Sequence, residues 1–237
     1  MDIKDSVVFV TGANRGLGLA FAQAALKRGA RKVYAGVRAP GKSQTPGIVQ
    51  VKLDVTDPAS IAQAAAQCGD TTLLVNNAGI ARLNSSVLDA SMVDLSREIF
   101  DTNYYGTIRV SQAFAPVLAR HGGGAIINVL SDATWFARPM LAAYSASKSA
   151  AWSFTNALRI ELRSQQTAVL GLHVSFMDTD MTHGFDMKKT GPAVVAEAAL
   201  AGIEAGQEEV LVDDFTRQVK GSLASAQPIY LDPPEIA

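Results

Sequence analysis

Short apolar runs alternate with longer amphipathic stretches along most of the chain. Runs of Val, Ile, Leu and Ala without polar alternation are typical of strands buried on both faces of a parallel sheet. Apolar residues three and four positions apart are typical of helices that cover such a sheet. Strands are predicted at 6–10, 31–37, 48–53, 72–76, 125–130, 169–176 and 209–212, and helices at 16–28, 58–69, 91–120, 142–163 and 192–205.

This alternation predicts an α/β fold, a doubly wound parallel sheet of about seven strands with helices on both faces. No repeat or linker interrupts the pattern, so we expect residues 1–237 to form a single domain. Prolines at 228, 233 and 234 predict an irregular tail. Ligands of such sheets bind at the carboxyl ends of the strands, so the residues that follow each strand are the candidates for chemistry.

The turn after the first predicted strand is rich in glycine. It reads Thr-Gly-Ala-Asn-Arg-Gly-Leu-Gly over residues 11–18, a G-x-x-x-G-x-G spacing between a strand and a helix. Glycines permit a tight turn and let the backbone approach a pyrophosphate at the N-terminus of a helix. An ordinary turn is the alternative. The strand before and the helix after favour a dinucleotide-binding site.

A tyrosine and a lysine four positions apart suggest proton chemistry. A helix places Tyr144 and Lys148 on one face, and a nearby ammonium can lower the tyrosine pKa by roughly 1–3 units. That would suit proton exchange with a carbonyl or alcohol oxygen. Ser131, at the end of a neighbouring strand, is expected to hydrogen-bond the same oxygen. The alternative for the pair is an exposed surface of a helix.

The order of these motifs resembles the short-chain dehydrogenase/reductase family over about residues 5–212. The Y-x-x-x-K pattern, a serine 13 positions before its tyrosine, and Asn-Asn-Ala-Gly at 76–79 all match. The resemblance implies a Rossmann-type fold and hydride transfer between a nicotinamide cofactor and a carbonyl or alcohol substrate. It also implies four catalytic residues: Asn103, Ser131, Tyr144 and Lys148.

The resemblance also implies the residues that bind the cofactor. Asp54 resembles the carboxylate that binds the adenine amino group, and Thr179 the residue that contacts the nicotinamide amide. One departure is that Val174 and Ser175 stand where the family has Pro-Gly, which leaves the placement of the nicotinamide ring open. The implied set is Gly12, Asn14, Arg15, Gly16, Leu17, Gly18, Arg38, Asp54, Val55, Asn77, Ala78, Gly79, Tyr144, Lys148 and Thr179.

The end of the second predicted strand favours NADP(H) over NAD(H). NAD enzymes of this fold place an acid about 20 residues past the glycine turn, where it binds the ribose 2′-hydroxyl. Residues 33–40 contain no acid, and Arg38 stands at that place. A guanidinium binds a 2′-phosphate through paired, charge-assisted hydrogen bonds, and Arg15 is expected to reach the same phosphate. The alternative for each arginine is a solvated surface charge.

Composition limits the other classes of function. The 21 basic and 22 acidic residues nearly balance, so no field for nucleic acid or an anionic membrane is expected. The polar start and the lack of a long apolar stretch predict a cytoplasmic protein. Cys68 is the only cysteine and the three histidines are scattered, so neither a disulfide nor a metal site is expected.

We therefore expect an NADP-dependent oxidoreductase, a carbonyl reductase acting on a small molecule. The predicted helices at 91–120 and 142–163 carry long apolar stretches, and the resemblance implies that they pair in a homodimer or homotetramer. One alternative is a sensor or scaffold that binds a dinucleotide without turnover; another is a dehydratase or epimerase on the same fold. The presence of both Tyr144 and Lys148 favours the reductase.

Overall fold

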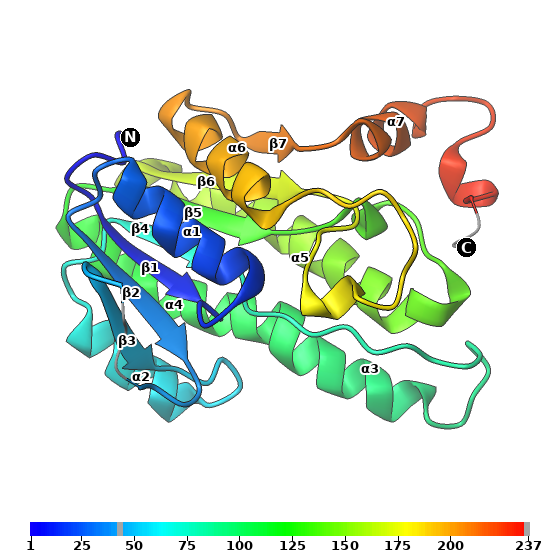
Figure 1. Cartoon of the computed structure of the whole chain (residues 1–237), viewed down its shortest axis with the longest axis horizontal. Coiled ribbons are helices and arrows are strands. Elements are labelled where there is room, and N and C mark those ends of the chain that lie inside the picture. The colour runs from blue at the N-terminus through cyan, green and yellow to red at the C-terminus, as the bar shows by residue number, and fades with distance from the viewer. Residues whose placement is uncertain (42–44, 235–237) are drawn as a thin grey trace.

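A parallel sheet forms the centre of the computed structural model, which describes residues 1–41 and 45–234 (Figure 1). The strand order is β3-β2-β1-β4-β5-β6-β7, and every neighbouring pair is parallel. The order reverses between β1 and β4, and a ligand site is expected at such a point. The strands are β1 Val7–Thr11, β2 Lys32–Val37, β3 Ile48–Lys52, β4 Leu73–Asn76, β5 Gly124–Val129, β6 Thr167–His173 and β7 Glu209–Leu211.

Helices cover both faces of the sheet. On one face α1 and α6 pack together, and on the other lie α2, α4 and α5 (Figure 1). Successive residues of β1 serve the two faces in turn, since Val8 packs in the first apolar core and Phe9 in the second. The helices are α1 Gly16–Lys27, α2 Pro58–Gln67, α3 Met92–Phe100, α4 Gly106–Arg120, α5 Ala142–Glu161, α6 Pro192–Glu204 and α7 Asp214–Ser222.

The predicted doubly wound sheet of seven strands is confirmed, and three local predictions need correction. The helix predicted at 91–120 is interrupted by a π-helical turn, Asp101–Tyr105. The strand predicted at 169–176 ends at His173, because the backbone N–H of Ser175 donates to the Asp213 carboxylate instead of continuing a ladder. Helix α7 was not predicted: its apolar residues are only Phe215 and Val219.

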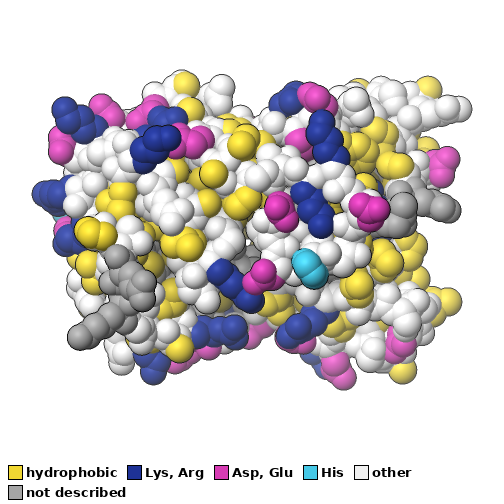
Figure 2. Space-filling view, in the orientation of Figure 1, with side chains coloured by type: hydrophobic (Ala, Val, Ile, Leu, Met, Phe, Trp, Pro, Cys, Tyr) yellow, Lys and Arg dark blue, Asp and Glu magenta, His cyan; other side chains and the backbone are white. Residues whose placement is uncertain are grey.

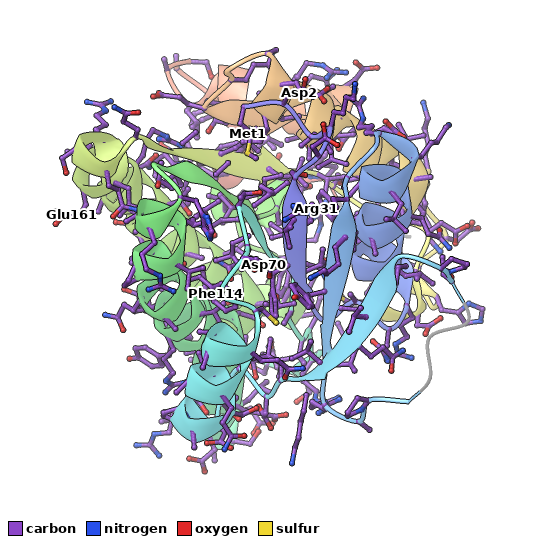
Figure 3. All side chains as sticks on the ribbon, turned by 90° about the vertical axis from the view of Figure 1, so that its left-hand side faces the viewer. Met1, Asp2, Arg31, Asp70, Phe114 and Glu161 are labelled. Carbon is purple, nitrogen blue, oxygen red and sulfur yellow. The ribbon has the colours of Figure 1, made fainter. Side chains whose placement is uncertain are left out.

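The amino-terminal and carboxyl-terminal ends of the strands carry different residues. Figure 3 looks at the amino-terminal ends of the strands, where Arg31 precedes β2 and Asp70 precedes β4. The predicted site residues lie at the opposite, carboxyl ends, together with the segment between β6 and α6 (Figure 1). In the described part of the chain, no helix combines the length and the hydropathy needed to span a bilayer.

Candidate active site

The glycine turn is a tight corner between β1 and α1. Gly12 and Gly16 have φ of +67° and +54°, a region that L-residues with side chains rarely adopt. A Cβ on Gly18 would lie 2.3 Å from the carbonyl oxygen of Gly12. Helix α1 begins at Gly16 without a side-chain cap and without an acid in its first turn. Its first backbone N–H groups therefore suit an anionic phosphate, so these residues fit a dinucleotide.

The end of β4 fixes the glycine turn in place. The side-chain Nδ2 of Asn77 donates to the carbonyl oxygens of Thr11, at 2.9 Å, and of Gly12, at 3.3 Å. The backbone N–H groups of Asn77 and Ala78 both donate to the Thr11 hydroxyl at 2.9 Å. Two neighbouring strand ends are thus joined, and the predicted residues at 12, 77 and 78 lie together.

Three more predicted cofactor residues lie beyond β3 and at the end of β2. The Asp54 carboxylate accepts from the backbone N–H of Thr56 at 2.9 Å and from its hydroxyl at 2.7 Å. These bonds, with a smaller effect of Arg38, hold the pKa of Asp54 below its usual range. Val55 is buried against Gly106, and Arg38 is exposed. Asp54 therefore has a turn-forming role besides the adenine contact that the family resemblance implies.

The segment after β6 reaches the glycine turn. A Cβ on Gly16 would lie 3.5 Å from the Cγ2 of Thr179, so Thr179 lies over the start of α1. Arg15 pairs with Asp180 at 2.6 Å, and both side chains are more than two-thirds exposed. Arg15 must therefore release Asp180 before its guanidinium can bind a phosphate beside Arg38. Asn14 is also exposed, whereas Leu17 is buried in the core.

Ser131, Tyr144 and Lys148 meet where β5 ends and α5 begins. Ser131 precedes a short 3-10 turn, Asp132–Thr134, and its hydroxyl is close enough to that of Tyr144 to lower the pKa of the tyrosine. The Nζ of Lys148 donates to the carbonyl oxygen of Val129 at 2.8 Å and lies 5.6 Å from the centre of the Tyr144 ring. The three predicted side chains thus form one group.

Burial controls the proton affinity of this group. It raises the pKa of Tyr144 to about 12, and the hydrogen bond with Ser131 only partly opposes this. It lowers the pKa of Lys148 to about 8. The expectation that the ammonium lowers the Tyr144 pKa is wrong for this structure, because burial dominates the shift and Lys148 is not among its causes. Tyr144 keeps part of its surface exposed, so a substrate can reach it.

Asn103 occupies the π-helical turn between α3 and α4. Its Oδ1 accepts from the backbone N–H of Ile80 at 2.8 Å, and its Nδ2 donates to the Ile80 carbonyl at 2.9 Å and to the Ser147 hydroxyl at 3.1 Å. A Cβ on Gly79 would lie 3.3 Å from that Oδ1. Asn103 therefore ties the segment after β4 to α5, next to Lys148. Such π-turns often occur at functional sites.

Sequence reasoning missed three polar residues beside Ser131. Asp132 is buried and accepts from the Ser131 hydroxyl at 2.8 Å, and burial raises its pKa. His173 is fully buried, stacks on Trp135 at 4.2 Å, and has its Nδ1 3.0 Å from the Ser131 carbonyl oxygen. Burial lowers the His173 pKa to about 4. The third is Arg138, which is buried and interacts electrostatically with Asp132. Only the position of Asp132, directly after Ser131, could have indicated from the sequence that one of these residues lies at the site.

The turn after β6, where the family resemblance implies Pro-Gly, is held in this chain by hydrogen bonds to other segments. Val174 is buried, and its carbonyl oxygen accepts from the backbone N–H of Asp132 at 3.2 Å. The N–H of Ser175 donates to the Asp213 carboxylate at 2.8 Å. These two bonds fix a turn that lacks both proline and glycine. Among the described residues, no cluster of three His, Cys, Asp or Glu side chains suits a metal ion.

Comparison with known proteins agrees with this geometry. The family model of the short-chain dehydrogenases matches residues 6–190, so the chain belongs to this family of oxidoreductases. It is 39% identical to a short-chain dehydrogenase from Burkholderia cenocepacia J2315 solved in complex with NADP, with a TM-score of 0.90 and 95% of each chain covered. It is 27% identical to the 3-oxoacyl-[acyl-carrier-protein] reductase FabG of Salmonella typhimurium over 98% of each chain.

A mammalian relative is similar over almost all of this chain. The Bos taurus protein named dehydrogenase/reductase SDR family member 7B is 29% identical over 96% of this chain and 70% of its own length. A gluconate 5-dehydrogenase from B. cenocepacia J2315, solved with NADP and tartrate, has a TM-score of 0.81 at 25% identity and covers 90% of this chain and 96% of its own. Relatives with different named substrates thus share this fold.

Proposed function

We propose that this protein is an NADP(H)-dependent carbonyl reductase that interconverts a carbonyl compound and its alcohol. The observation that carries the proposal is the contact of the Tyr144 and Ser131 hydroxyls beside the buried Lys148. Tyr144 acts as the general acid and base, and Ser131 holds the substrate oxygen. As the family resemblance implies, Lys148 would also contact the ribose of a bound nicotinamide cofactor, and Asn103 would help hold a water near Lys148.

Proton chemistry at Tyr144 fits reduction at neutral pH. With a pKa of about 12, the hydroxyl keeps its proton and can give it to a carbonyl oxygen. Bound at the glycine turn, the nicotinamide cofactor supplies the hydride. A sensor or scaffold would not need this hydroxyl pair, and a dehydratase or epimerase would consume no net cofactor. The experiment below distinguishes these two alternatives from the reductase.

Replacement of Tyr144 by Phe tests the reaction directly. This change removes the hydroxyl and keeps the ring, so turnover of NADPH with a carbonyl panel should fall by at least about 100-fold. Cofactor affinity, measured by NADPH fluorescence, should be nearly retained. Near-normal turnover in Tyr144→Phe would contradict the assignment, and no NADPH consumption by the wild type would favour the sensor.

The choice of NADP(H) rests on the end of β2. The positions just past β2 offer Arg38 and no acid, and a relative that is 39% identical was solved with NADP. The rest of the proposed cofactor site consists of residues 12 and 14–18 together with Asp54, Val55, Asn77, Ala78, Gly79 and Thr179.

An exchange of charge at Arg38 tests this choice. Arg38→Asp should repel the 2′-phosphate and shift the NADPH/NADH ratio of kcat/KM toward NADH by about 10-fold or more. Arg31→Asp, at the other end of β2, is the matched control and should leave the ratio unchanged (Figure 3). If the wild type used NADH as well as NADPH at low salt, the NADP(H) assignment would fail.

Three further proposals concern the whole chain. Residues 1–237 form one domain, since a single sheet carries both halves of the site. The protein acts in the cytoplasm on a small molecule. It assembles as a homodimer or homotetramer, for which the exposed apolar side chains of α3 and α5 provide the support.

A further inference from the structure

Arg138 is a buried cation, and two nitrogens of its guanidinium have no hydrogen-bond partner among the described residues. Its residue is only 7% exposed, yet neither Nε nor Nη2 has a hydrogen-bond partner in the described part of the chain. Burying unpaired polar groups is costly, so native proteins rarely leave them without a partner. Nε and Nη2 form one edge of the guanidinium, whose parallel N–H groups match the two oxygens of a carboxylate.

The surroundings of Arg138 hold it in place without neutralising it. The guanidinium lies 4.6 Å from the centre of the Phe136 ring and 5.8 Å from that of Phe176. Asp132 is the acid that acts on it, but no ion pair within 4.0 Å joins them among the described residues. Asp132 already accepts from Ser131 and Ala133, and burial raises its pKa.

Arg138 lies near the catalytic side chains, since it interacts electrostatically with Asp132, the acceptor of the Ser131 hydroxyl. It lies in the segment between Ser131 and Tyr144, just before the 3-10 turn Pro139–Leu141 that leads into α5. Phe176, which it faces, packs at 5.4 Å on Phe185 of the segment between β6 and α6. The cofactor residues of the glycine turn instead contact Thr179, further along that segment.

We infer that Arg138 binds a carboxylate on the carbonyl substrate, so that the preferred substrates are keto acids. This inference rests on the proposed reductase activity and narrows its substrate class. The paired N–H groups would fix one end of the substrate while Ser131 and Tyr144 hold the reacting oxygen. Two aromatic rings keep the guanidinium in one orientation, which reduces the entropy lost on binding.

Matched keto acids and their neutral esters test the inference. The substrates are 4-oxopentanoate and 5-oxohexanoate, each beside its methyl ester, with NADPH and the intact protein. In the wild type the acid should exceed its ester in kcat/KM by about 10- to 100-fold for at least one pair, the range for a charge-assisted hydrogen bond. Equal values for acid and ester in both pairs would overturn the inference.

Substitution of Arg138 assigns the preference to this side chain. Arg138→Met should bring the acid-to-ester ratio close to one, and Arg138→Lys should leave an intermediate ratio because it keeps the charge and loses the fork. Arg31→Met is the control, since Arg31 is exposed and lies at the opposite, amino-terminal ends of the strands (Figure 3). A full preference in Arg138→Met would refute the role. If that variant does not fold, an unchanged ratio in Arg138→Lys has the same consequence.

Calorimetry separates this inference from the proposed function. The 4-oxopentanoate ion is titrated into the protein loaded with NADP⁺, where no turnover is needed. Binding of the ion but not of its ester, lost in Arg138→Met, supports the carboxylate site even if no carbonyl compound is reduced. Reduction of the esters without any preference for the acids would instead support the reductase and overturn the site.

Discussion

Burial acts on Tyr144 and Lys148 in opposite directions. It raises the tyrosine pKa to about 12 and lowers the lysine pKa to about 8, so both groups are shifted toward their neutral forms. Tyr144 therefore carries its proton throughout the neutral range. Lys148 loses its charge close to neutrality, and this loss is the titration that a pH profile can detect.

The charge of Lys148 predicts the pH dependence of reduction. A lowered lysine pKa means that the ammonium is present below about pH 8 and lost as the pH rises through that value. If the ammonium is needed, kcat/KM for NADPH-dependent reduction should fall about tenfold per pH unit above that point. In Lys148→Arg, which stays charged, the fall should move to higher pH. A profile that is flat to about pH 10 would contradict this role for Lys148.

Among single residues, the fixed spacing of a motif predicted which side chains come together, whereas the polarity of a side chain wrongly suggested that it is exposed. Tyr144, Lys148 and Ser131 were predicted because their order and separation have a chemical reason. Asp132 and Arg138 were passed over, because charged residues are usually exposed and burial cannot be read from the local sequence. The direction of the Tyr144 pKa was wrong for the same reason, since desolvation depends on the folded surroundings.

Helix α7 supports the site through the residue that caps it. The Asp213 carboxylate accepts from the N–H and the hydroxyl of Thr216, at 2.9 and 2.8 Å, and from the N–H of Ser175 at 2.8 Å. One side chain therefore begins the helix and fixes the turn that follows β6.

Removal of the Asp213 carboxylate should weaken both features. Asp213→Ala loses the cap and leaves the Ser175 N–H without its acceptor, so the free energy of unfolding should fall by about 1–3 kcal/mol. Cofactor affinity should fall too, because the turn borders the proposed nicotinamide site. Urea unfolding and NADPH titration measure the two effects. Asp214→Ala is the control: Asp214 is exposed and pairs only on the surface with Arg217, so a similar loss there would rule out a specific role for Asp213.

Elements with strong apolar periodicity were predicted well, and polar or irregular ones were not. The strands of the sheet center on the predicted runs, because burial on both faces requires continuous apolar sequence. Helix α7 has just two apolar residues, and its capping residue Asp213 also binds the distant Ser175. The π-turn around Asn103 carries no propensity signal, since it is fixed by bonds to Ile80 and Ser147.

At the scale of the molecule, apolar side chains are exposed in two regions. Figure 2 shows hydrophobic side chains at the right-hand end, where Figure 1 places the loop before α3 and the tail after α7. Leu88 in that loop is 91% exposed, and Leu231 in the tail is 69% exposed. A shallow hollow along α3 and the π-turn is lined by Met92, Val93, Ser96, Arg97, Phe100 and Tyr105. Contiguous apolar surface of this kind marks contact sites between proteins.

The exposed apolar residues of α3 and α5 predict self-association through these helices. Val93 on α3 is 59% exposed and Ile160 on α5 is 65% exposed, and closed symmetry pairs such surfaces with their own copies. Light scattering should give two or four times the 25.0 kDa of one chain. The double variant Val93→Asp with Ile160→Asp should lower this mass, because it buries charge at the contact. Val194→Asp, equally exposed but on α6 across the sheet, should leave the mass unchanged. A wild-type mass of one chain would refute the assembly, and an effect of Val194→Asp alone would place the contact on α6.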